Sequence, residues 1–461
     1  MFRPLSQAAS QPASQPAPRP AFNLASNLNP DRRFLLAHIG FDKPIVRAQG
    51  HYLYDADGNR YLDCLAQYGA LPFGHNPAFL WAALDRARAA AEPSMVQPLI
   101  APAAEALAGK LVELAPCEAG YVTFSNSGAE AVESAIKLAR AKTRRPLILA
   151  TDQGFHGKTL GALSATGSAQ YRDPFLLDTT RFAHIAYGDL AALERRLDGG
   201  DVAGFIVEPI QGEAGMITPP DGYLKEAGAL CRRAKTLFIL DEIQTGLGRT
   251  GHLFAAEREA LDPDILLLAK ALGGGLVSLG AAICHARAWS ADFGLYHSST
   301  FANNHLSCTV GLATLERLTQ DGRELIGHVR RVGHDLGEAL ARLVRAYPGV
   351  YRAASGRGLM QSLTLMPWDG EQSYFLSHAS STGMAAPLVC GYLLHEHGIL
   401  IAPTFNHRNV LRLEPPLTIG RAHIDRLLAA LEETAQRLAA GEHGALLRYL
   451  TTLPTPAPRA A

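Results

Sequence analysis

DILLLAKALGGG, residues 264–275, is a short apolar run that ends at a lysine and continues into three glycines. The run predicts a buried strand, and the glycines predict a flexible turn. A second run, TLFILD at residues 236–241, ends in the same way at Asp241. Because open α/β sheets bind ligands at the carboxyl ends of parallel strands, we expect Lys270 and Asp241 to point into one crevice.

An amine and a carboxylate in one crevice suit pyridoxal phosphate. In such a site the lysine binds the cofactor covalently, and the aspartate keeps the pyridine nitrogen protonated so that the ring can accept electrons. Taken singly, Lys270 is equally well explained as a solvated strand end and Asp241 as a helix cap or loop residue. Three further segments, which supply the other parts of such a site, favour the cofactor interpretation.

The composition is that of a large protein without net charge. The chain has 461 residues, enough for a large core, and Lys plus Arg and Asp plus Glu both number 43. Neither a nucleic-acid partner nor a membrane span is indicated. The six cysteines lack CxxC spacing, so we expect reduced thiols of a cytoplasmic protein, with no disulfide framework and no metal site.

The order of the predicted elements favours an α/β fold. Residues 52–63 resemble a β-hairpin closed at Asp57-Gly58. Strands and helices then alternate, which is typical of a mostly parallel sheet, and amphipathic helices with short strands follow after about Gln320. The expected strands lie near 121–124, 147–150, 204–207, 236–240, 265–269 and 281–284.

These patterns predict five consecutive regions. We expect a disordered leader at 1–30, an N-terminal segment at 31–75 that joins the small domain, a large cofactor-binding domain at 76–320, a C-terminal small domain at 321–445 and a flexible tail at 446–461.

Ser127, Gly128 and Ala129 stand where a predicted strand leads into a predicted helix. Small residues at a helix N-terminus leave backbone N–H groups free to bind a phosphate, aided by the helix dipole. Ser127 and Glu130 also match a capping box, so an ordinary capped helix remains an alternative.

Residues 154–159, GFHGKT, place an aromatic residue between two glycines after the strand expected at 147–150. Phe155 is suited to lie against a cofactor ring, although simple packing explains it as well. Gln244, three residues after Asp241, is expected within reach of the ring's phenolic oxygen.

Arg412 lies between apolar neighbours in VLRLEPPL, residues 410–417. A buried guanidinium needs a carboxylate partner, either from the protein or from a substrate. Glu213, in EPIQGE at residues 208–213, is the expected partner. The pair is either a permanent ion pair or a switch in which a substrate carboxylate replaces Glu213.

At this point the chain resembles the class III pyridoxal-phosphate aminotransferases, which include the ornithine, acetylornithine, 4-aminobutyrate and putrescine enzymes. The likeness spans about residues 45 to 420, and residues 155–165 and 208–215 are most similar to putrescine-type members. Its motifs are DEIQTGLGRTG at 241–251, LAKALGGG at 268–275, and the segments 54–63, 74–77, 125–129 and 411–417.

The resemblance implies fold type I, with a mostly parallel sheet in a large domain and a smaller α/β domain built from both chain ends. It also implies a homodimer with shared active sites, and transamination with pyridoxal 5'-phosphate. Lys270 is then the Schiff-base lysine, Asp241 pairs with the pyridinium nitrogen, and Gln244 contacts the phenolic oxygen.

The other site residues follow from the same resemblance. Phe155 stacks on the ring, and His156 and Glu208 are further cofactor contacts. The phosphate is held by Ser127, Gly128 and Ala129, with Thr300 reaching the phosphate in the neighbouring subunit. Arg412 binds the α-carboxylate of glutamate or 2-oxoglutarate, with Glu213 as its gate.

One loop departs from the family pattern. The usual Thr-Phe-Gly-Gly-Asn-Pro reads TFANNH at residues 300–305, which changes the backbone freedom of a loop that borders the neighbouring site. Thr300 is retained, so cofactor binding is still expected, but no substrate assignment carries over.

The expected reaction moves the terminal amino group of an amine, a putrescine-like diamine or an ω-amino acid to a 2-oxo acid, with 2-oxoglutarate as the expected acceptor. The freed, neutral Lys270 would act as general base. The alternatives are another pyridoxal-phosphate reaction such as decarboxylation, ornithine or acetylornithine transamination, amination of a long-chain or carrier-linked aldehyde, and a non-catalytic scaffold. Apolar residues at 402–405 are compatible with the long-chain substrate. The sequence does not identify the amine donor.

Overall fold

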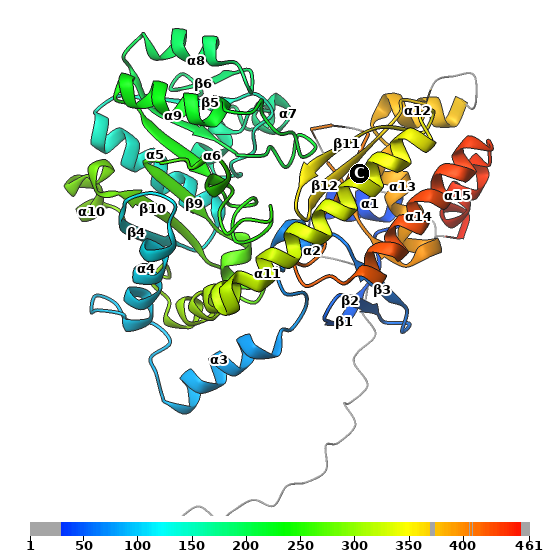
Figure 1. Ribbon diagram of the computed structural model, residues 1–461, viewed down its shortest axis with the longest axis horizontal. Helices are drawn as coiled ribbons and strands as arrows, with labels where there is room; N and C mark the ends of the chain where they lie inside the picture. Colours follow the sequence, from blue (N-terminus) through cyan, green and yellow to red (C-terminus); the bar gives the residue numbers. More distant parts are fainter. Residues whose placement is uncertain (1–28, 369–373, 405, 408, 453–461) are drawn as a thin grey trace, which may run out of the picture.

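The computed structural model describes residues 29–368, 374–404, 406–407 and 409–452 (Figure 1). Residues 1–28 of the expected leader lie outside this part of the chain, as does Phe405 of the apolar stretch at 402–405. Within it, two bodies of secondary structure stand side by side, and the long helix α11 (His305–Ala346) runs from one to the other.

The larger body is built on a seven-stranded sheet of order β4-β10-β9-β8-β7-β5-β6. All neighbours run parallel except β10, which is antiparallel to β9 and to β4. The mostly parallel sheet predicted from the sequence is therefore confirmed. The strands are β4 (Ala119–Ser125), β5 (Leu147–Thr151), β6 (Phe182–Ile185), β7 (Val202–Val207), β8 (Leu237–Asp241), β9 (Ile265–Leu268) and β10 (Gly280–His285).

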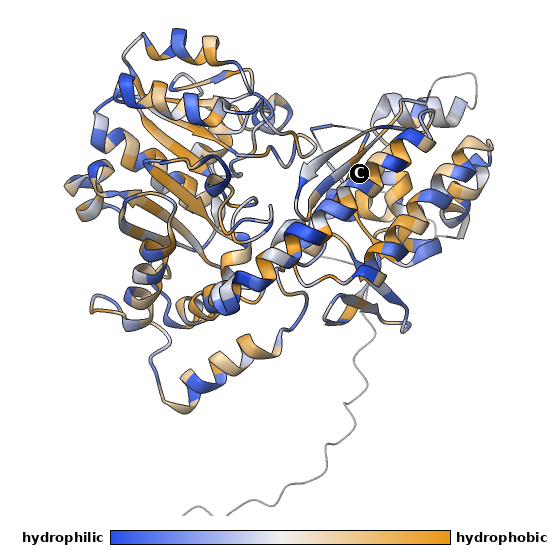
Figure 2. Ribbon diagram, in the orientation of Figure 1, coloured by the Kyte–Doolittle hydropathy of each residue, from blue (hydrophilic) through white to orange (hydrophobic). Residues whose placement is uncertain are grey.

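Successive residues of these strands belong to different hydrophobic clusters. In β9, Leu266 and Leu268 pack into one cluster, whereas Ile265 and Leu267 pack into another. Because side chains alternate across a strand, the sheet is covered on both faces, and its strands are hydrophobic throughout (Figure 2). Strand β6 was not predicted, since its half-buried residues lack a continuous apolar run.

Helix α5 (Gly128–Thr143) shows how the sequence forms the layer on one face. Ser127 caps its N-terminus, and the predicted apolar stripe from Ala131 to Ala139 is buried against the sheet. The remaining helices of this body are α3 (Ala78–Ala89), α4 (Pro102–Leu114), α6 (Leu160–Ala165), α7 (Ala169–Arg172), α8 (Leu190–Leu197), α9 (Tyr223–Ala234) and α10 (Ala291–Tyr296), with short 3-10 turns at Asp173–Phe175, Ala255–Glu259, Lys270–Gly273 and Ala286–Ala288.

The smaller body is built from both ends of the described chain, as expected. One sheet joins β1 (Ile45–Gln49), β2 (Tyr52–Asp55) and β3 (Arg60–Asp63) to the late strand β13 (Ile399–Leu400), and the predicted hairpin is formed by β2 and β3. The second sheet has the order β11-β12-β15-β14. Its strands are β11 (Tyr351–Arg357), β12 (Met360–Leu365), β15 (Val410–Leu413) and β14 (Ala402–Pro403), and the helices of this body are α1 (Pro30–His38), α2 (Ala66–Gly69), α12 (Tyr374–Thr382), α13 (Ala385–His397), α14 (Arg421–Ala439) and α15 (His443–Thr452).

Helix α11 changes direction where the sequence pattern changes. Residues 320–323 leave helical geometry, and Asp321 and Arg323 have positive φ. Before this break, Gly311 packs on Leu107 of α4, and after it Gly333 packs on Gly358 between β11 and β12. The two halves therefore belong to different bodies, while the predicted domain boundaries themselves stay predictions.

The expected flexible tail at 446–461 begins too early in the prediction. Residues 446–452 continue helix α15, in which Leu446 and Tyr449 are buried. The prediction failed because only the proline-rich residues after this helix carry an obvious turn signal, whereas the helix is held by packing against α13.

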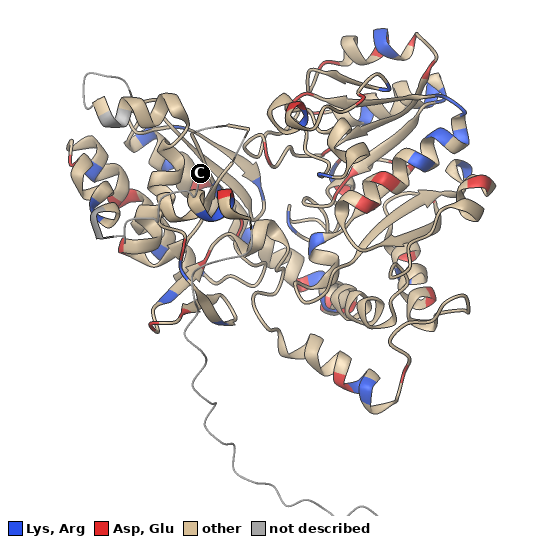
Figure 3. Cartoon of the chain, turned by 180° about the vertical axis from the view of Figure 1, so that it is seen from behind, with Lys and Arg blue, Asp and Glu red and all other residues tan. Residues whose placement is uncertain are grey.

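Charged side chains of both signs are interspersed over the outer helices (Figure 3). In the part of the chain that the structure describes, no helix combines the length and the apolar character needed to cross a membrane.

The contact between α13 and α15 can be tested with two glycines. A Cβ on Gly391 would overlap the Tyr449 hydroxyl and the Ile39 carbonyl, whereas a Cβ on Gly444 would meet nothing. We expect Gly391→Ala to destabilise the protein by about 1–3 kcal/mol and to lower its Tm. The matched Gly444→Ala should leave the Tm unchanged or raise it slightly. Equal Tm values for both variants would show that α15 does not pack as described.

Candidate active site

A cavity of about 560 Å³ opens at the carboxyl ends of the parallel strands. Loops that follow β5, β7, β8 and β9 all reach it, as expected for an open α/β sheet. Nine of the twelve predicted site residues line it, namely Ser127, Gly128, Ala129, Phe155, His156, Glu208, Asp241, Gln244 and Lys270. The strand ends thus bring the predicted amine and carboxylate to one cavity.

Lys270 opens a 3-10 turn directly after β9 and has a φ of 42°. A lysine in this left-handed region is uncommon and stores some backbone strain, which tertiary contacts must hold. Burial lowers the pKa of its amine from the ordinary value, and the negative charge of Glu414 acts in the opposite direction. Lys270 is therefore a better base and nucleophile near neutral pH than a surface lysine.

Asp241 ends β8 and contacts His156. Its Oδ2 lies 2.7 Å from His156 Nδ1, and its Oδ1 accepts from the Ile243 N–H at 3.1 Å. Burial acts to lower the pKa of His156, but the hydrogen bond and charge of Asp241 outweigh it and raise the pKa. The sequence indicated both residues for the site, but not that one holds the other.

Glu208, at the end of β7, fixes the backbone beside Phe155. Its two oxygens accept from the Phe155 N–H at 2.9 Å and the Gly212 N–H at 3.2 Å. Burial raises the pKa of this carboxyl to about 7. Glu208 therefore positions the aromatic residue at the cavity wall.

Both interpretations of the α5 N-terminus hold at the same time. The Ser127 hydroxyl accepts from the Glu130 N–H at 3.2 Å, so the helix is capped. The Glu130 carboxylate, however, accepts from Asn126 and not from Ser127 itself. The N–H groups of Gly128 and Ala129 are in the first turn and have no acceptor within the helix, which leaves them for an anion.

Arg412 is almost fully buried and lies between two carboxylates. Its Nη2 bonds with Glu213, as expected, and its Nη1 lies 3.4 Å from Glu414 Oε2. The Tyr68 ring centre lies 5.1 Å from the guanidinium carbon. Burial acts to lower the pKa of Arg412, but the two carboxylates outweigh it and raise the pKa.

Glu414 is the site residue that sequence reasoning missed. It lies two positions after Arg412 at the end of a strand, and residues two apart share one face of a strand, so the LRLEPP pattern carried a usable signal. Its carboxylate also accepts two contacts from the Gln244 amide, at 2.7 and 3.0 Å. In this structure Gln244 is thus tied to Glu414, while its expected contact with the cofactor stays a prediction.

Thr300 is exposed and is not among the described residues that line the cavity of its own chain. Its carbonyl accepts from the Gln97 side chain at 3.1 Å. The altered loop that follows has its own anchors, because Asn304 caps α11 and buried His305 lies 2.7 Å from Glu92. The expected role of Thr300 toward a neighbouring subunit stays a prediction.

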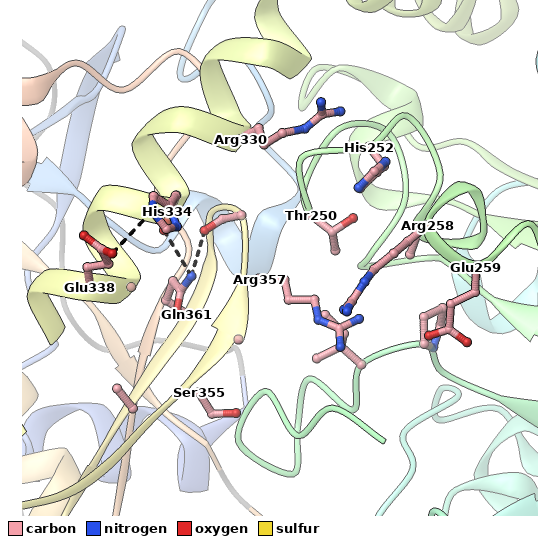
Figure 4. Close-up of a pocket in the computed structure, with 18 of the residues that line it drawn as sticks. Thr250, His252, Arg258, Glu259, Arg330, His334, Glu338, Ser355, Arg357 and Gln361 are labelled. Carbon is pink, nitrogen blue, oxygen red and sulfur yellow. Dashed lines mark hydrogen bonds and ion pairs between the residues drawn. The ribbon is translucent and has the colours of Figure 1, made fainter. Parts of the chain in front are cut away.

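A second cavity, of about 640 Å³, lies between residues 250–261, α11 and the hairpin of β11 and β12 (Figure 4). Arg258 and Arg357 both approach the exposed Asp221, at 3.3 and 3.7 Å. None of the predicted site residues is among the described residues that line this cavity. Although it is larger, it lacks the lysine and carboxylate that the chemistry needs.

Comparison with known proteins agrees with this geometry. The profile of the aminotransferase class-III family matches residues 39–435. Aminotransferase PigE from Serratia sp. is 37% identical over 438 residues, covering 86% of this chain, which spans only 51% of that relative. Putrescine aminotransferase from Pectobacterium atrosepticum is 39% identical over 404 residues, with 85% and 82% of the two chains covered.

A solved structure shows the same fold. The ornithine aminotransferase from Toxoplasma gondii superposes with a TM-score of 0.77 at 31% identity, over 87% of this chain and 92% of the other. That enzyme has also been crystallised with partial occupancy of PLP at its active site. The expected fold type I architecture is confirmed.

The lowered pKa of Lys270 can be measured without cofactor. Burial disfavours the ammonium form, so the neutral amine should appear at a lower pH than in an exposed lysine. With the apoprotein and an amine-acylating reagent, we expect the labelling of Lys270 to reach half its maximum below the ordinary lysine pKa. Peptide mass spectrometry would measure this, with exposed Lys110 and Lys142 as internal controls. A midpoint equal to theirs would contradict the effect of burial.

Proposed function

The chain belongs to the class III aminotransferase family, and on that premise we propose that it transfers the terminal amino group of a diamine or ω-amino acid to a 2-oxo acid. We take 2-oxoglutarate as the acceptor, and an aldehyde and glutamate as products. The observation that carries the proposal is the ion pair of Arg412 with Glu213 in the same site as Lys270. Two alternating substrates, one with a carboxylate and one without, require such an exchangeable pair.

The residues at the cavity fit pyridoxal 5'-phosphate. Lys270 offers a nucleophilic amine, and the first turn of α5 offers free N–H groups to the phosphate. Asp241, oriented by His156, offers a carboxylate to the ring nitrogen, and Phe155 offers an aromatic face. When bound, the cofactor supplies an electron sink for the carbon that loses a proton.

The protein's own groups then handle protons and charge. Lys270 Nζ, whose burial favours the neutral form, takes the proton from the substrate carbon that bears the amine and delivers it again within the site. Arg412 binds the carboxylate of the 2-oxo acid when Glu213 turns away. Glu213 returns to Arg412 when the donor has no carboxylate to place there.

Similarity to a putrescine aminotransferase supports a diamine as donor. Ornithine, acetylornithine, 4-aminobutyrate and long-chain amines are the other donors to test. A cytoplasmic location belongs to the same proposal, because all six cysteines are free thiols, as is typical of reducing compartments.

The test is a donor panel with purified protein, pyridoxal phosphate and 2-oxoglutarate, with glutamate formation as the readout. We expect putrescine to be among the best donors, and Lys270→Ala to reduce turnover by about a thousandfold or more because the base is lost. Glutamate formation by Lys270→Ala at the unsubstituted rate would sink the assignment. Reaction without any 2-oxo acid would instead favour decarboxylation or an internal amino shift.

We also propose a homodimer with shared active sites. Several large apolar side chains are exposed in the single chain around Thr300, among them Leu99 (75%), Ile100 (79%), Tyr296 (82%) and Phe301 (58%). The segments that carry them are adjacent, since the Gln97 side chain bonds the Thr300 carbonyl and the His305 N–H bonds Ser94. Apolar surface of this kind beside a site residue supports a subunit interface.

Ile100→Glu would place a charge in that interface. Burying an unpaired carboxylate should weaken the dimer by on the order of 2 kcal/mol or more, which is about thirtyfold in Kd. We expect sedimentation to show monomers at concentrations where the unsubstituted protein is dimeric, together with loss of activity. Ala429→Glu, at an exposed position of α14, is the matched control and should stay dimeric. An unchanged Kd in Ile100→Glu would exclude this surface as the interface.

A further inference from the structure

Glu414 joins several buried groups at the end of β15. It has no solvent exposure, and its oxygens contact the Gln244 amide at 2.7 and 3.0 Å and Arg412 Nη1 at 3.4 Å. Its own N–H donates to the Cys64 carbonyl at 2.8 Å, and Pro415 and Pro416 follow it. Glu414 is thus fixed by backbone and side-chain contacts together.

A second buried guanidinium lies close to the same carboxylate. A Cβ on Gly69 would lie 3.4 Å from Glu414 Oε1 and 3.5 Å from Arg249 Nε, so both groups meet this glycine. Arg249 is buried, and its Nη1 donates to the carbonyls of Leu359 and Pro415. Burial lowers the pKa of Arg249 to about 10, and the charge of Glu414 opposes that shift. Glu414 therefore compensates two guanidiniums.

Glu213, the other carboxylate at Arg412, is held much less firmly. Its side chain is 14% exposed, against 0% for Glu414. It lies between Gly212 and Gly215, and the latter has a φ of 108°. Glu213 can therefore leave Arg412, whereas Glu414 must stay. Without Glu414, the departure of Glu213 would leave Arg412 buried without any carboxylate from the protein.

The charge of Glu414 also reaches the reacting end of the cavity. Among the charged groups that act on the Lys270 amine, Glu414 has the largest effect, and its sign favours a cation. Electrostatic interactions are strong in such a water-poor site, so a substrate's ammonium should be favoured there as well.

Resting on the proposed transamination, we propose that Glu414 is a specificity-determining residue: its fixed, buried carboxylate makes the site favour donors with a second ammonium over donors with a carboxylate at the far end. Arg412 with Glu213 and Glu414 carries one more negative than positive charge while Glu213 is in place. A dicationic diamine gains from this charge. A carboxylate-bearing donor must first displace Glu213 and then still faces Glu414.

Putrescine and 4-aminobutyrate test this directly, because they have the same number of carbons and differ in their far group. In the unsubstituted holoenzyme we expect the kcat/KM of putrescine to exceed that of 4-aminobutyrate. In Glu414→Gln, which keeps the shape and removes the charge, the ratio of the two kcat/KM values should fall about tenfold or more. Glu414→Asp, which keeps the charge, should retain a ratio closer to the original.

A second readout needs no cofactor and no turnover. Removing the Glu414 charge disfavours the ammonium form of Lys270, so the labelling midpoint of Lys270 in the apoprotein should move to lower pH in Glu414→Gln and less in Glu414→Asp. A merely structural role of Glu414 would not move this midpoint in that direction.

The outcomes separate the inference from the proposed function. An unchanged donor ratio in an active Glu414→Gln variant would overturn the inference and leave transamination standing. A preference of the unsubstituted protein for 4-aminobutyrate would overturn it without any variant, which covers the case that Glu414→Gln does not fold. No glutamate from any donor would overturn the proposed function and the inference with it.

Discussion

The buried cation Arg412 imposes the strictest constraint on this structure. A guanidinium without access to water is stable only if carboxylates and dipoles surround it, and here they come from three separate parts of the chain. Glu213 follows β7, Glu414 ends β15, and Tyr68 lies in the turn after β3. The larger and the smaller body are therefore joined at the site by charge as well as by packing.

The same network links the substrate-binding groups to the reacting lysine. Glu414 contacts both Arg412 and Gln244, and its charge acts on Lys270. A change in the charge of any one member is felt by the others, because little water is present to screen it. Substrate choice and lysine basicity are thus two consequences of one arrangement of charges, and Glu208 and Asp241 extend it along the strand ends.

Much of the site was predictable because the chemistry lies next to strong local signals. Lys270 and Asp241 end apolar runs, and the small residues 127–129 begin a helix, so their placement at one sheet edge follows from strand order alone. Glu414 was missed although it shares a strand face with Arg412, since an acidic residue before two prolines looks like an ordinary turn. The helix at 446–452 was missed because its stability comes from Gly391 and its neighbours on α13, not from its own sequence.

By itself the sequence determined the α/β class, the mostly parallel sheet, the strand ends that carry Lys270 and Asp241, and the need for a partner for Arg412. These depend on periodicity and on local chemistry, which act over a few residues. Only the tertiary structure decided that His156 holds Asp241, that Gln244 bonds Glu414, and that Arg412 has two carboxylates of unequal mobility. Such contacts join residues far apart in the chain, and their strength depends on burial, which exists only once the two bodies have packed together.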